Sequence, residues 1–176
     1  IAIGFLGFAS GLPLLLTLST LSIWLAEEGV TKTAIGLFAL VGIPYSLKFL
    51  WAPLIDRLPV PLLTRALGRR RGWMILTQVL LMAALLGLGA TSPAEMPEVT
   101  AICALAVAFC SASQDIVIDA YRVEILEERE YGAGAAMIVF GYRCGLLVAG
   151  AGALYIASIT SWFWVYAAMA ALVLVG

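Results

Sequence analysis

Apolar residues fall into six long blocks along the chain, and short polar stretches separate most of them. A helix needs about 20 mostly apolar residues to cross the hydrocarbon core of a bilayer. Six blocks reach or approach this length: 3–26, 33–55, 73–91, 98–122, 132–157 and 161–176. The separators EEGVTK, TSPAEMPE and EEREYG are typical of turns. The pattern predicts an all-α membrane protein with six transmembrane helices in one domain spanning residues 1–176.

Small residues and prolines inside these blocks indicate how the helices pack. Gly141, Gly145, Ala149 and Ala153 recur every four residues, which places them on one helix face. Such a stripe allows another helix to approach closely. Pro13 and Pro44 lie inside the first and second blocks, where we expect them to kink the helices.

Composition supports a lipid environment and removes several functional classes. The chain of 176 residues is 63% hydrophobic and only 12% charged, whereas soluble domains are about one quarter charged. A net charge of −1 gives no sign of a nucleic-acid partner. The absence of histidine from the sequence removes the usual proton carrier and most zinc sites. We expect no metal, no other cofactor and no enzymatic activity, and we expect the three cysteines, Cys103, Cys110 and Cys144, to be small buried thiols.

Basic residues predict the orientation of the chain. The connection 56–72 holds five arginines: Arg57, Arg65, Arg69, Arg70 and Arg71. Because cytoplasmic loops carry an excess of basic residues, we expect this loop and the N-terminus to be cytoplasmic. The chain starts without Met and ends inside an apolar run. We therefore expect it to be a piece of a longer protein, and we see no cleavable signal.

Three ionisable residues share one face of the fourth predicted helix. At 100° per residue, Asp115, Asp119 and Arg122 fall within about 60° of one another, and Ser111 joins them. Glu124 points to the opposite side and is interpreted as a flanking charge. Intramembrane ionisable groups indicate a functional site by default. The alternative is structural: ion pairs that fix the order of the helices and do nothing else.

Two further charges lie inside the predicted membrane segments. Arg143 is about eleven residues from the cytoplasmic end of its helix, as is Asp115, so both lie about 15 Å deep. We expect these two residues to form an ion pair or to line a wet cavity together, because an unpaired charge at the bilayer centre is costly. Lys48 is predicted at the depth of Asp119. It could pair with that carboxylate, or it could extend towards the cytoplasmic surface.

The first predicted helix carries a polar stripe of its own. Ser10, Thr17, Thr20 and Trp24 cluster within about 80° on this helix. Hydroxyl groups and an indole facing a cavity suit a sugar-like or amide-rich solute. Hydrogen bonds between helices are the alternative explanation.

Several motifs give the chain a resemblance to a known family. Asp56–Arg57 followed by GRRRG is similar to the cytoplasmic loop signature of the major facilitator superfamily, with about ten residues inserted. The segments GFASGLPLLLT, GLFALVGIPYSLKFLWAPLIDR, GRRRGW, ASQDIVIDAYR and GAGAAMIVFGYR resemble the AmpG-type muropeptide permeases in order and along nearly the whole chain. The acetyl-CoA transporters share a QDI…D pattern but resemble this chain less around GYR.

The resemblance implies a fold and a function. The chain would form one six-helix half of a twelve-helix transporter, itself a 3+3 inverted repeat. The whole protein would be a multi-pass protein of the bacterial inner membrane that imports anhydro-muropeptides together with protons. Its partners would be this solute, protons, the lipid bilayer and a missing C-terminal six-helix half. Alternatives are another solute, such as acetyl-CoA or a sugar derivative, or a half-transporter that serves only as an interaction module.

Roles for the polar residues follow within this interpretation. Asp115 is the leading carboxylate, and Arg143 is its partner or an anchor for an anionic solute. Ser10, Thr17, Thr20 and Lys48 belong to the same predicted pathway. A second group is predicted to form a cytoplasmic gate: Asp56, Arg57, Asp119 and Arg122.

Overall fold

The computed structural model describes residues 2–61 and 63–176, and it folds them into a bundle of helices without strands in that part of the chain. The first half contains α1 (Ala2–Thr17), α2 (Ser19–Glu27), α3 (Lys32–Phe38), α4 (Ile43–Leu47), α5 (Ala52–Arg57), α6 (Leu63–Leu67) and α7 (Arg69–Gly89). The second half contains α8 (Pro97–Ile125), α9 (Tyr131–Leu147), α10 (Ala153–Ala157) and α11 (Trp162–Val173). Short 3-10 segments lie at η1 (Ala39–Gly42), η2 (Lys48–Leu50) and η3 (Glu128–Glu130), and a π-helical segment at η4 (Val148–Gly152).

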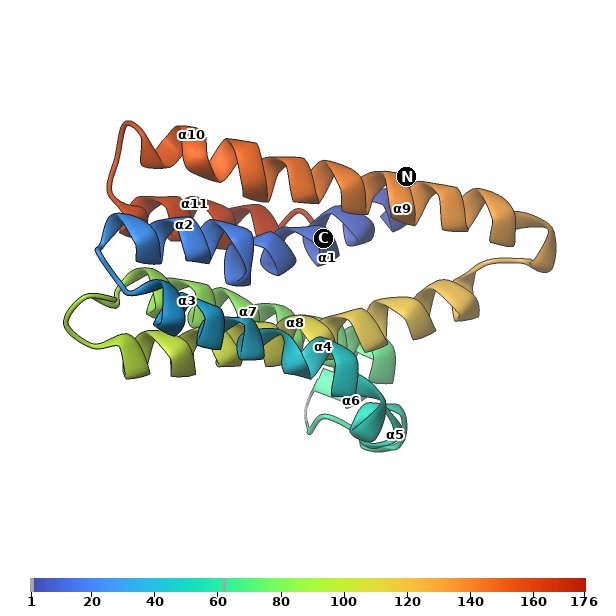
Figure 1. Cartoon of the computed structure of the whole chain (residues 1–176). Coiled ribbons are helices and arrows are strands. Elements are labelled where there is room, and N and C mark those ends of the chain that lie inside the picture. The colour runs from blue at the N-terminus through green and yellow to red at the C-terminus, as the bar shows by residue number, and fades with distance from the viewer. Residues whose placement is uncertain (1, 62) are drawn as a thin grey trace.

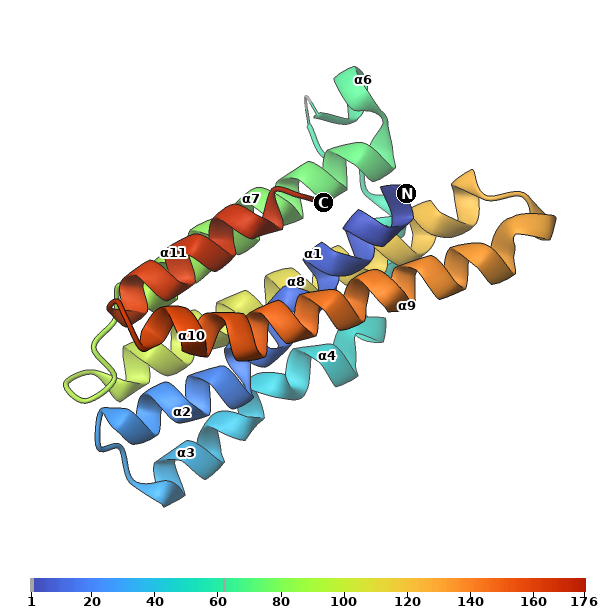
Figure 2. The same cartoon turned by 90° about the horizontal axis from the view of Figure 1, so that it is seen from above.

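These segments combine into long rods that lie side by side (Figures 1 and 2). Five rods are long and apolar enough to cross a membrane: Ala2–Glu27, Lys32–Leu50, Arg69–Gly89, Pro97–Ile125 and Glu128–Ala157. Where the sequence predicts a sixth span, the structure has the shorter apolar helix α11. The prediction of an all-α fold of membrane-spanning helices is confirmed for the described residues. The predicted loop 56–72 is partly helical, since α5 ends in it and α6 lies within it, and both project from one end of the bundle.

The two predicted proline kinks have different outcomes. Pro44 is the second residue of α4, in its first turn, where its missing N–H costs little, and the second rod is broken on both sides of α4. Helix α1 instead continues through Pro13 and ends four residues later. At that end the Thr17 hydroxyl donates to the carbonyls of Pro13 and Leu14, at 3.0 and 3.1 Å. This hydroxyl therefore supplies a donor to backbone carbonyls next to the break between α1 and α2.

Helices α1 and α9 pack closely through glycine, as the small-residue stripe predicts. A Cβ atom on Gly141 or Gly145 would overlap the backbone carbonyls of Gly4 and Phe8. Gly7 of α1 meets α9 in the same way, with the carbonyl of Ile138 as its nearest neighbour. The backbones of α1 and α9 are thus in direct contact, and this contact fixes which face α9 turns towards the bundle.

The main apolar core lies between α1, α2, α7, α8 and α11. It contains fully buried side chains such as Leu12, Leu85, Val107 and Met169. Buried Tyr166 donates its hydroxyl to the carbonyl of Leu16 at 2.9 Å. The three cysteines, Cys103, Cys110 and Cys144, are half-buried free thiols, so they are more exposed than predicted. This core holds α1 and α8 together, and the polar site is built between these helices.

Candidate functional site

Asp115 of α8 is the centre of a polar cluster within a membrane-spanning helix. The Ser10 hydroxyl of α1 donates to Asp115 Oδ1 at 2.5 Å. Lys48 Nζ, at the start of η2, lies 3.8 Å from Asp115 Oδ2, which makes an ion pair. The Asp115 side chain is 17% exposed and that of Lys48 is 36% exposed. Three elements that are distant in sequence therefore meet at one partly buried carboxylate.

The predicted partners of Asp115 and Lys48 are wrong. Lys48 pairs with Asp115 and not with Asp119. Arg143 is exposed on α9 and takes part in no ion pair among the residues that the structure describes. The reason is rotational: Gly141 faces α1, and Arg143 follows it by two residues, which turns Arg143 about 200° around the helix. Depth in the membrane alone does not determine this direction.

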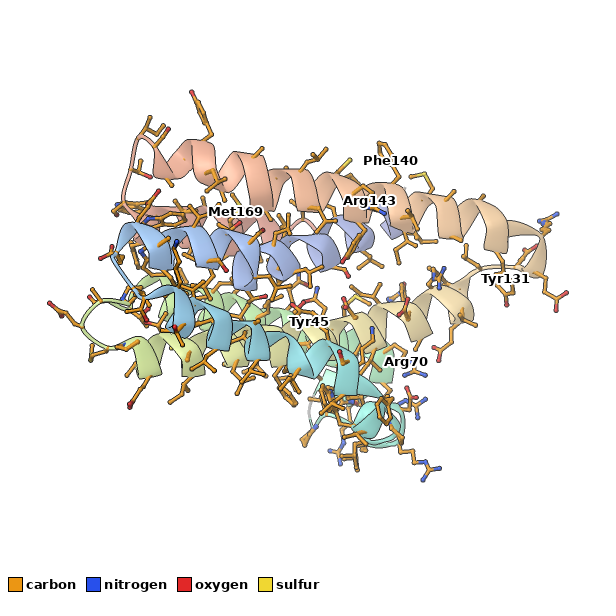
Figure 3. All side chains as sticks on the ribbon, in the orientation of Figure 1. Tyr45, Arg70, Tyr131, Phe140, Arg143 and Met169 are labelled. Atoms are coloured by element: carbon orange, nitrogen blue, oxygen red, sulfur yellow. The ribbon has the colours of Figure 1, made fainter. Side chains whose placement is uncertain are left out.

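Buried polar groups without partners lie on α4 and α8, near the carboxylate in sequence or in space. The hydroxyls of Tyr45 and Ser111 and both amide atoms of Gln114 are buried and have no hydrogen-bond partner within the described residues. Tyr45 lies on α4 in Figure 3, three residues before Lys48. Tyr45 was not among the predicted site residues, although a hydroxyl three residues before an intramembrane lysine shares its helix face. Gln114 directly precedes Asp115 and also received no role.

The polar stripe of the first rod serves several purposes. Only Ser10 contacts Asp115. Thr17 bonds to carbonyls of its own helix, and Thr20 donates to the carbonyl of Ala149 in η4 at 2.9 Å. The Trp24 indole donates to Glu28 at 3.3 Å and its ring stacks on Trp162. The alternative explanation, hydrogen bonding between helices, therefore accounts for Thr20, and backbone bonding accounts for Thr17.

A second charged cluster lies at the arginine-rich end of the bundle, where Arg70 of α7 joins two acids (Figure 3). Its Nη1 atom lies 2.5 Å from Asp56 Oδ1 of α5, and its Nε atom lies 2.8 Å from Glu124 Oε1 of α8. The Arg70 side chain is only 15% exposed, whereas those of Asp56 and Glu124 are 46% and 50% exposed. Arg70 thus ties α5, α7 and α8 together.

The composition of the predicted gate is therefore corrected. Asp56 belongs to the cluster, but its partner is Arg70, and Arg57 forms no ion pair in the described parts of the chain. Asp119 and Arg122 form a separate pair within α8, with 3.6 Å between Arg122 Nη2 and Asp119 Oδ1. The interpretation of Glu124 as a flanking charge is wrong, because Glu124 faces α7.

The loop fold explains why the sequence missed these partners. Trp73 donates its indole N–H to the carbonyl of Leu58 at 2.8 Å, and Thr64 accepts the backbone N–H of Val60 at 2.8 Å. These bonds fold the connection between α5 and α7 back on itself. Asp56 and Arg70 meet although fourteen positions separate them. The predicted simple loop would not bring these two residues together.

A family model and several known proteins match this chain. A family model described as "Acetyl-coenzyme A transporter 1" matches residues 3–95. "Anhydromuropeptide permease" of Escherichia coli (strain K12) is 48% identical over 170 residues, which cover 96% of this chain and 34% of the relative. "Putative transporter AmpG 4" of Rickettsia felis is 39% identical over 159 residues, covering 90% of this chain and 38% of that protein. The chain spans about a third of the length of these relatives.

Proposed function

Because this chain belongs to the transporter family described as "Acetyl-coenzyme A transporter 1", as an AmpG-type member, we propose that the protein containing it imports anhydro-muropeptides together with protons. Two observations support the solute: a permease named for anhydromuropeptide is 48% identical over 96% of this chain, and the intramembrane cluster offers hydroxyls, an amide and a cation. Such groups suit a solute that carries sugars, amides and carboxylates.

The observation that carries the proposal is the site around Asp115. An intramembrane charge costs at least ~2.5–3.5 kcal/mol on insertion scales, and here two charges lie within membrane-spanning segments together with buried unpaired polar groups. A purely structural ion pair would give no reason for the buried hydroxyls of Tyr45 and Ser111 next to it. A solute pathway supplies that reason, because a solute can pair with them.

Protons would bind at Asp115. This chain contains no histidine, so within it an intramembrane carboxylate is the group suited to carry a proton. Asp115 is the carboxylate that contacts α1, η2 and α8 together. Its protonation would remove the charge that holds Lys48, and the helices around it would then be free to rearrange. Coupling of this kind requires only one bistable contact.

The arginine-rich end would face the cytoplasm of a bacterial inner-membrane protein. Five arginines in the connection 56–72 support this orientation. The cluster of Asp56, Arg70 and Glu124 would act as a gate that holds α5, α7 and α8 together in one state and releases them in the other. Asp119 and Arg122 would contribute from the neighbouring turn of α8.

The rest of the protein would complete the pathway. Helix α9 presents Arg143 on an exposed face, and a cation within a membrane span needs a partner or water. We propose that this face lies against the remaining helices or the solute path, where Arg143 binds an anionic group. The solute would then sit between the part described here and a second group of helices, as in transporters built from two halves.

Uptake by the full-length gene product in membrane vesicles tests the proposal. Labelled anhydro-muropeptide is offered with and without an imposed pH gradient, and we expect accumulation that a protonophore abolishes. Asp115→Asn should abolish gradient-driven accumulation, whereas Glu98→Gln, at the other end of α8, should leave it unchanged. Absence of uptake would exclude the solute, and accumulation insensitive to the protonophore would exclude the proton.

A coenzyme A ester is the second candidate solute. The description of the matching family model favours it. Labelled acetyl-CoA in the same vesicles separates the two candidates. Uptake of acetyl-CoA without uptake of the muropeptide would make the coenzyme A ester the favoured solute.

A further inference from the structure

The cluster around Asp115 contains a lysine ammonium that bonds to no acceptor among the described residues. Lys48 Nζ lies 3.8 Å from Asp115 Oδ2, which is close enough for an ion pair but too far for a hydrogen bond. A lysine ammonium has three N–H donors, and Lys48 makes no hydrogen bond to any part of the chain that the structure describes. The strongest donor of the site is therefore left without an acceptor.

Two hydroxyls near Asp115 are also buried, and they lie close to each other. Tyr45 is on the turn of helix before Lys48, and Ser111 is one helical turn before Asp115. Their hydroxyl oxygens are buried and have no partner within residues 2–61 and 63–176. The acceptor at the centre, Asp115 Oδ1, is already bonded to Ser10. Buried unpaired donors are unfavourable, and native sites normally provide them with an acceptor.

The other titratable groups near Asp115 make no hydrogen bond to Lys48 in the described structure. They are Asp119 on the same helix, paired with Arg122, and Tyr142 on α9, whose hydroxyl can itself donate. Helix α1 contributes the neutral Ser10. A group that only accepts hydrogen bonds would therefore satisfy the Lys48 ammonium, and the two hydroxyls could donate to the same group.

We propose that Lys48, Tyr45 and Ser111 bind a carboxylate of the transported solute. A carboxylate accepts only, through about four lone-pair positions on two oxygens, and it matches an ammonium flanked by two hydroxyls. This inference rests on the proposed function, and it assigns the solute carboxylate to a particular cation.

The charges of the site then link carboxylate binding to proton binding. Lys48 and Asp115 together are neutral, so an arriving carboxylate brings the group to a net charge of −1. One proton taken up by Asp115 from water restores neutrality and releases Lys48 to the solute. Lys48 is therefore shared by two carboxylates that exclude each other, and solute and proton load together.

The test uses the full-length protein in proteoliposomes and measures exchange of labelled solute without a gradient. Two solutes are compared: an anhydro-muropeptide with free carboxylates and the same molecule with those carboxylates amidated. We expect Lys48→Gln to lower exchange of the free-carboxylate form about 10- to 100-fold more than exchange of the amidated form, as for the loss of a hydrogen bond to a charged group. Tyr45→Phe should lower exchange of the free-carboxylate form alone.

Two matched variants control for charge and folding. Lys48→Arg keeps the cation and should keep the preference for the free carboxylate. Lys32→Gln removes a lysine at the start of α3, away from the cluster, and should change neither exchange rate. The inference is overturned if wild-type protein exchanges both forms equally, or if Lys48→Gln lowers both equally. Failure of wild-type protein to exchange either form instead overturns the proposed function, and the inference with it.

Discussion

Replacing Arg70 by Gln should loosen the arginine-rich end of the bundle. Arg70 is the cation that holds Asp56 of α5 and Glu124 of α8, through contacts of 2.5 and 2.8 Å. Glutamine retains a polar side chain of intermediate length but cannot make either ion pair. Helices α5 and α6 are short and project from the bundle, and the Arg70 contact adds to the packing of buried Ile55 against Ile116 and Val117 of α8.

The size of the effect follows from exposure. Both acids are about half exposed and are hydrated when Arg70 is removed. Each ion pair therefore contributes about 0.5–1 kcal/mol to the stability of the closed arrangement. Two pairs give a total of about 1–2 kcal/mol. A free energy of this size changes the population of the open arrangement by a factor of about 5–30.

Hydrogen exchange of the full-length protein, read by mass spectrometry, measures this population. We expect the backbone amides of α5 and α6 to exchange about 5–30 times faster in Arg70→Gln, whereas those in the middle of α7 should keep their rates. The matched control is Glu127→Gln, which breaks the highly exposed pair of Glu127 and Arg129 and should change little. Unchanged exchange in α5 and α6 would refute the view that Arg70 holds them.

Three further changes have outcomes that follow from the packing. Gly145→Ala places a Cβ atom against the carbonyl of Phe8 and should destabilise the full-length protein by about 1–3 kcal/mol in thermal unfolding. Gly132→Ala, where a Cβ atom meets no atom within 4 Å, should not destabilise it. Thr20→Val removes the 2.9 Å bond to the carbonyl of Ala149 and should cost about 0.6–1.7 kcal/mol by the same measurement; an unchanged melting temperature would contradict a role for this bond. Asp119→Asn should alter transport and conformational balance if the pair with Arg122 belongs to the gate, and unaltered transport would remove Asp119 from it.

Much of the architecture could be predicted from local properties of the sequence. The six apolar blocks, their lengths and the low charge predict membrane-spanning helices, because each helix satisfies its own backbone and needs only an apolar surface of sufficient length. The stripe containing Gly141 and Gly145 predicted a close helix contact, since this property depends on one helix alone. Asp115 and Lys48 were recognised as intramembrane charges for the same reason.

The sequence by itself thus determined the class of the protein, the approximate spans and which polar residues lie within the membrane. The tertiary structure decided their partners. Lys48 replaced Arg143 at Asp115 because the glycine contact with α1 turns Arg143 outward. Arg70 and Glu124 lie next to Asp56 because the connection before α7 folds back. Tyr45 belongs to the site because it lies on α4, between the segments η1 and η2 of the second rod. Depth along a helix follows from residue number, but rotation about its axis is set by the neighbour against which it packs.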